Sequence, residues 1–215
     1  YPKRIADLRA AIAHRSVENE LKAHREKIAE AQAEVQTKLE ALSGKMDYEL
    51  YAAAEGSISS LEKVLKAGED LAEKDAPYAK ELKAQNAKVE GYRITSRQRW
   101  IEAADAAVVA KLEGLDKKAG QPEFQGAEDA LRTLNKTIDS GKGLTQSKDY
   151  LKLIASAEKQ AGAYKAKIDK KRVDLVVDAH RNELEGAVKS AEERMEALKE
   201  KPDQAAFKAA DQAVN

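Results

Sequence analysis

The chain has 215 residues, with 38 Lys and Arg residues balanced by 38 Asp and Glu residues, so its formal net charge at pH 7 is zero. It has no Cys, which excludes disulfides and thiolate metal sites, and no apolar run near the roughly 20 residues of a membrane span. The balanced charge argues against a globally basic nucleic-acid binder, whereas the abundance of Ala, Glu, Lys, Leu and Arg is typical of long helices and coiled coils.

The first part of the chain predicts two helices that end near Gly44 and Gly68. The first of them repeats apolar residues at steps of 7, 7, 4 and 3, as a helix packed on one side does. Its apolar face consists of Leu21, Ile28, Val35, Leu39 and Leu42. A polar loop follows Gly68 and ends at Asp75, which we expect to cap the next helix.

The next predicted helix runs from Asp75 to about Asp116, because isolated glycines within it weaken a helix by only about 1 kcal/mol each. Gly120 separates it from a helix that closes at Gly141 and carries a second apolar stripe. That stripe consists of Phe124, Ala127, Leu131, Leu134 and Ile138.

A further continuous helix is predicted from about Asp149, with Ser147 or Asp149 as its N-cap, to about Glu200. Lys201 and Pro202 end it, and residues 205–215 then form an amphipathic helix. No segment alternates with period two, so no strands are expected.

The helices recur in one order, which predicts internal repeats. Residues 38–42 (KLEAL) match 111–115 (KLEGL) and 194–198 (RMEAL). The aromatic residues Tyr51, Phe124 and Phe207 then begin equivalent helices. With Tyr1, Tyr92 and Tyr164 as markers, the units are residues 1–91, 92–163 and 164–215, and the last unit lacks its third helix.

Three helices per unit, with the third continuing into the first of the next, resemble the layout of spectrin repeats. The units here are shorter, at 92 − 1 = 91 and 164 − 92 = 72 residues, and Trp100 is the single Trp. The resemblance implies an all-α, elongated tandem array of antiparallel three-helix bundles with continuous helices across the junctions. It implies no functional residues, because a shared fold does not carry a shared function.

Basic residues follow each marker tyrosine, and in the second copy Trp100 stands among them. One interpretation is a patch that binds an anion or nucleic acid and stacks bases on the aromatic ring. The other, which we favour, is packing at the junctions against acidic segments such as Glu69, Asp70 or Glu73. The candidate patch consists of Arg93, Arg97, Arg99, Trp100, Lys165, Lys167, Lys170, Lys171 and Arg172.

Catalytic and metal-binding patterns are weak. His14 precedes Glu18 by four residues and His180 precedes Glu183 by three, spacings that fit surface pairs with carboxylates better than a metal site. No Ser or Lys has an evident activating partner. We therefore predict no catalytic residue, no metal and no cofactor, and a protein that is not an enzyme.

The sequence thus predicts a non-catalytic spacer or scaffold that engages protein partners or flanking repeats, within a larger protein. The first alternative is a polyanion- or nucleic-acid-binding module that uses the basic patch. The second is a helical ligand-sensing ectodomain with an apolar pocket. No targeting signal is visible, so the sequence predicts no compartment.

Overall fold

The computed structural model describes residues 2–42, 47–144, 147–200 and 204–214. Within these ranges the chain is all-helical and contains no strand, as the sequence predicts. The helices are α1 (Pro2–Ala41), α2 (Tyr48–Lys66), the single turn α3 (Glu69–Ala72), α4 (Ala76–Lys117), α5 (Gln121–Gly141), α6 (Lys148–Glu200) and α7 (Gln204–Val214).

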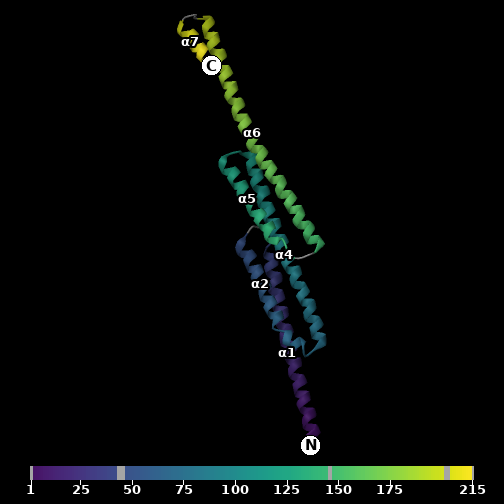
Figure 1. The fold of residues 1–215 in the computed structure, drawn as a ribbon. Coiled ribbons are helices and arrows are strands. Elements are labelled where there is room, and N and C mark those ends of the chain that lie inside the picture. The colour runs from purple at the N-terminus through teal and green to yellow at the C-terminus, as the bar shows by residue number, and fades with distance from the viewer. Residues whose placement is uncertain (1, 43–46, 145–146, 201–203, 215) are drawn as a thin grey trace.

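The molecule is elongated, and its two termini lie at opposite ends (Figure 1). Two long helices set this shape: α4 has 42 residues and α6 has 53. At 1.5 Å per residue they extend about 63 Å and about 80 Å. Both agree closely with the predicted continuous helices, and the isolated Gly91, Gly114, Gly162 and Gly186 lie inside them.

The apolar side chains form two separate cores. The first is lined by α1 with the adjoining Leu42, by α2 and by the N-terminal part of α4: Leu21, Ile28, Val35, Leu39, Leu42, Ala54, Ile58, Leu61, Leu65, Tyr78, Leu82 and Val89. The second is lined by the C-terminal part of α4, by α5 and by the N-terminal part of α6: Ile101, Ala104, Val108, Leu112, Leu115, Phe124, Ala127, Leu131, Leu134, Ile138, Tyr150, Ile154, Ala161 and Ile168. Both predicted apolar stripes are therefore buried, and α4 contributes to both cores.

Side-chain caps account for two of the helix starts. The predicted cap Asp75 is confirmed, since its carboxylate accepts a hydrogen bond of 2.7 Å from the Tyr78 amide, and Pro77 lies in the first turn of α4. Asp47 caps α2 in the same way, a role that the sequence analysis missed. Of the two candidate caps of α6, Ser147 lies immediately before the helix, and Asp149 lies in its first turn. The predicted stops Gly44 and Lys201-Pro202 fall outside the described residues.

Apolar side chains are exposed towards both ends of the molecule. Near the start of α1 they are Ile5, Leu8 and Ile12. Beyond the second core, on the outer part of α6 and on α7, they are Val173, Leu175, Val176, Val177, Leu184, Val188, Met195 and Phe207. Phe207 therefore does not anchor a core, whereas its counterpart Phe124 does.

The two phenylalanines give a direct test of this difference. Phe124 is 2% exposed and Phe207 is 62% exposed. Phe124→Ala should lower the free energy of unfolding by about 3–5 kcal/mol, because it leaves a cavity in the second core. Phe207→Ala should change it by no more than about 0.5 kcal/mol, as is usual for surface positions. Urea denaturation measures both, and equal losses would contradict this assignment of the core.

Candidate functional site

The candidate patch begins in the middle of α4, between the two cores, where each Arg side chain contacts a neighbouring helix. The Arg93 Nη2 lies 2.7 Å from the Glu62 carboxylate of α2. The Arg97 Nη1 donates to the Ser140 hydroxyl of α5 at 2.6 Å. Arg99 donates to the backbone carbonyl of Leu39 in α1. These three arginines therefore tie α4 to three different helices.

Trp100 is buried against Tyr51 of α2. The two rings are stacked with their centroids 4.5 Å apart and an interplanar angle of 21°. On the same Tyr51 ring, the Arg97 guanidinium carbon lies 5.0 Å from the ring centroid, a cation–π distance. Burial raises the pKa of Tyr51 to about 12, although the Arg97 charge opposes the shift. The Trp100 ring is thus packed against Tyr51 and presents little surface to a nucleobase.

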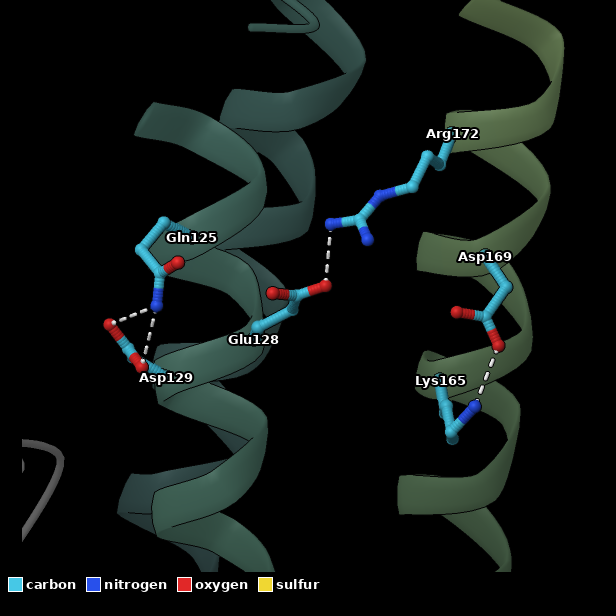
Figure 2. Close-up of polar contacts among 6 residues, drawn as sticks. All are labelled: Gln125, Glu128, Asp129, Lys165, Asp169 and Arg172. Atoms are coloured by element: carbon cyan, nitrogen blue, oxygen red, sulfur yellow. Dashed lines mark hydrogen bonds and ion pairs between the residues drawn. The ribbon is translucent and has the colours of Figure 1, made fainter. Parts of the chain in front are cut away.

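The second part of the patch lies on α6 and also faces carboxylates. Figure 2 shows Arg172 reaching Glu128 of α5, with 2.6 Å between Nη2 and Oε1, and Lys165 bonding Asp169 on its own helix at 2.8 Å. Lys167 and Lys171 both contact Asp116 near the end of α4, at 2.7 and 3.0 Å. Their hydrogen bonds lower the pKa of the Asp116 carboxyl. Lys170 is exposed.

The two parts of the patch share one packing feature, a side chain that covers an aromatic residue. Tyr51 and Phe124 occupy corresponding positions in α2 and α5, at an offset of 124 − 51 = 73 residues. Trp100 covers Tyr51, and the Arg172 guanidinium carbon lies 5.2 Å from the centre of the Phe124 ring. In each case a long side chain from the helix that leaves the core covers the aromatic residue that begins the middle helix.

The acidic partners of the patch differ from those suggested by the sequence. Glu69, Asp70 and Glu73 were expected nearby, but Arg93, Lys167 and Arg172 pair with Glu62, Asp116 and Glu128. These carboxylates lie within helices α2, α4 and α5, at sequence separations of 31 to 51 residues. Sequence spacing along one helix gives no signal for such contacts.

A second constellation, which the sequence analysis did not identify, joins His24, Tyr78 and Gly68. The buried His24 places Nε2 at 2.9 Å from the Val64 carbonyl, and its Nδ1 contacts the Tyr78 hydroxyl. A carbonyl only accepts, so Nε2 carries the proton and Tyr78 donates to Nδ1. The α3 side of this contact is closed by Gly68, where an added Cβ would lie 2.6 Å from His24 Cε1 and 2.7 Å from the Tyr78 hydroxyl oxygen.

The same close approach recurs between the end of α5 and the start of α6. Tyr150 donates directly to the Gly141 carbonyl at 3.0 Å, and a Cβ on Gly141 would lie 2.6 Å from the Tyr150 hydroxyl oxygen. Arg97 takes the place of His24, since 97 − 24 and 141 − 68 are both 73, and its Cγ would lie 3.1 Å from the same Cβ. Each glycine therefore leaves room for a tyrosine from another helix. Tyr78 of α4 packs at the end of α2, and Tyr150 of α6 packs at the end of α5.

The remaining histidines lie on the surface, and so does a groove between α5 and α6. His14 lies 3.5 Å from Glu18 and His180 lies 3.3 Å from Glu183, all on exposed helix faces. Across the described residues no group of three potential metal ligands occurs. A surface groove of about 450 Å³ between α5 and α6 has Leu131 and Ile168 as its apolar lining, among charged and amide side chains.

Comparisons with protein-family models, with curated proteins and with solved structures find no significant match to this chain. None of the helices in the described ranges is long and apolar enough to cross a membrane.

The close approach at Gly141 can be tested by adding a single methyl group. Gly141→Ala should lower the free energy of unfolding by about 1–3 kcal/mol, because the methyl group meets the Tyr150 hydroxyl. In a Tyr150→Phe background this cost should fall by about 1 kcal/mol, which a double-mutant cycle measures. Gly162→Ala is the matched control: nothing lies within 4 Å of its Cβ, so it should stabilise α6 by about 0.5–1 kcal/mol. An equal cost of Gly141→Ala in both backgrounds would exclude the hydroxyl as its cause.

The raised pKa of Tyr51 predicts a loss of stability in alkali. An unfolded tyrosine ionises near pH 10 and folded Tyr51 near pH 12, so its contribution is complete below pH 10 and is lost as the pH rises to 12. After a discount for partial exposure we expect an effect on the order of 1 kcal/mol. Urea denaturation from pH 9 to 12 should therefore show a smaller loss for Tyr51→Phe than for the parent chain. Tyr48→Phe, at an exposed position, should leave the parent slope unchanged, and identical slopes for all three chains would refute the assignment.

Proposed function

We propose that the chain is a non-catalytic spacer or scaffold segment, built from tandem, spectrin-like three-helix units, that engages protein partners or flanking repeats. The observation that carries this proposal is that α4 contributes to both cores. Leu82 and Val89 are buried in the first core, and Val108 and Leu112 of the same uninterrupted helix are buried in the second. Because one helix is packed into both cores, it fixes the orientation of one core relative to the other.

The proposed units are residues 1–91, 92–163 and 164–215. Tyr92 and Tyr164, which mark their boundaries, lie inside α4 and α6 and not in loops. Each boundary is therefore a stretch of helix, and the two cores cannot rotate against each other without bending α4. This arrangement supports a stiff connection.

The junction contacts add to this stiffness. Arg93 holds α4 to α2, whereas Arg97 holds it to α5. Ser96, between them, is fully buried and donates to Glu55 at 2.7 Å. A bend in α4 would have to break contacts on both sides, which supports a role in fixing a distance.

The same contacts favour the spacer over the polyanion-binding alternative. Arg93, Lys167, Lys171 and Arg172 already face carboxylates of this chain. A polyanion would have to displace these partners before it released any counterions, which is the usual source of affinity for phosphate backbones. The basic segments are thus better explained by packing at the junctions.

The substitution Ser96→Pro tests the spacer directly. Proline removes one backbone donor and clashes with the Tyr92 carbonyl, at a cost of about 3 kcal/mol or more. We expect small-angle scattering at low concentration to show a shorter or more flexible particle, while circular dichroism shows almost unchanged helix content. Ser96→Ala, which removes the bond to Glu55 but keeps the helix, should retain the parent dimensions. Unchanged dimensions for Ser96→Pro would mean that α4 does not set the shape, and the spacer proposal would have to be abandoned.

A further inference from the structure

The outer part of α6 packs against α7, and this pair of helices corresponds to the first two helices of the second proposed unit. Phe207 corresponds to Phe124 at an offset of 207 − 124 = 83 residues. At the same offset Leu184 corresponds to Ile101, yet Leu184 is 67% exposed and Ile101 is 3% exposed. Met195 likewise is exposed where Leu112 is buried. Three positions that are core in the second proposed unit are thus uncovered here, whereas Ala210, the counterpart of Ala127, is buried.

In the second core the corresponding apolar face is covered by a third helix. There the third side is provided by α6, whose inward residues Ile154, Ala157 and Ala161 advance by steps of 3 and 4. The start of α1 carries Ile5, Leu8 and Ile12 at the same two steps, and these side chains are exposed. The start of α1 therefore has the apolar stripe of a third helix without the two helices that such a stripe covers.

The charges of the two surfaces are opposite. Residues 2–17 of α1 contain four basic residues and one acidic residue, a net charge of +3. Residues 173–200 of α6 contain eight acidic and four basic residues, a net charge of −4. Lys208 and Asp211 of α7 balance each other. Opposite net charges favour the encounter of these two surfaces over the pairing of either with itself.

The two surfaces lie at opposite ends of an elongated molecule, so one molecule cannot bring them together (Figure 1). We infer that residues 2–17 of a second copy of this chain pack against the exposed apolar face of the outer part of α6 and of α7. This inference rests on the repeat architecture of the proposed function. In this arrangement α1 of the second copy runs parallel to α6, and the copies join head to tail. Such an interface does not close on itself, so it generates an open, linear assembly.

Sedimentation velocity of the full chain tests this. The weight-average sedimentation coefficient should rise with concentration between about 10 µM and about 500 µM, as mass action requires, and should rise less at high salt. Replacing Ile5, Leu8 and Ile12 by Ser (the N-face variant) should weaken association at least about tenfold. The matched control replaces Ala6, Ala10 and Ala13, which point away from the stripe, by Ser and should associate like the parent chain.

A mixing experiment then distinguishes head-to-tail association from any other kind. The C-face variant replaces Leu184, Met195 and Phe207 by Ser. Each face variant alone should remain a monomer, because one of its two surfaces is lost. An equimolar mixture of the N-face and C-face variants should form complexes of two chains and none larger, since only one intact surface of each kind remains in the pair.

Three results would overturn the inference: a parent chain that stays monomeric at all concentrations, a face variant that still associates alone, or a mixture that does not pair. A monomeric parent chain that keeps its elongated dimensions would refute self-association and leave the spacer intact. A compact monomer would refute the spacer as well.

Discussion

The burial of a single helix, α4, in two successive cores is the interaction on which the rest of the molecule depends. Its first third presents Tyr78 and Leu82 to α1 and α2, and its last third presents Val108 and Leu112 to α5 and α6. A break between them would leave both cores joined only by a flexible segment. The junction residues remove that freedom, because Ser96 is fully buried between the cores and Arg93 and Arg97 hold opposite neighbours. The fixed relation of the two cores follows from this one helix, and α4 and α6 together set the elongated shape.

The basic segments illustrate how the same residues can suggest binding in sequence and packing in structure. A guanidinium is planar and weakly hydrated, so it can cover an aromatic ring while its edge bonds a carboxylate. Arg172 does both, lying over Phe124 and bonding Glu128. Trp100 fills the equivalent place over Tyr51, where Arg97 contributes the charge. In both places a large side chain from the following helix covers an aromatic residue near the start of a middle helix, Tyr51 in α2 or Phe124 in α5.

Periodicity along the chain was sufficient to predict the helices, because the apolar stripe of each is a local property. Asp75 was equally predictable as a cap, since it acts within its own first turn. The contacts between helices were not predictable from the sequence. The clearest example is the contact between His24 and Tyr78, which are 54 residues apart. The repeated Gly68 and Gly141, with a tyrosine 10 and 9 residues later, were visible in the sequence. The packing role of these glycines was not visible, because only the folded structure shows that a tyrosine hydroxyl lies where their Cβ would be.

Periodicity also cannot tell a covered stripe from an uncovered one. Phe124 and Phe207 begin equivalent helices, yet one is buried and the other exposed, and the difference lies in a neighbouring helix. In a linear array each unit is stabilised by its own third helix, and that helix is also the first helix of the next unit. In this chain two apolar surfaces are exposed, one at the start of α1 and one on the outer part of α6 with α7. The net charge is +3 over residues 2–17 and −4 over residues 173–200, and such opposite charges favour contact between the two surfaces over the pairing of either with itself.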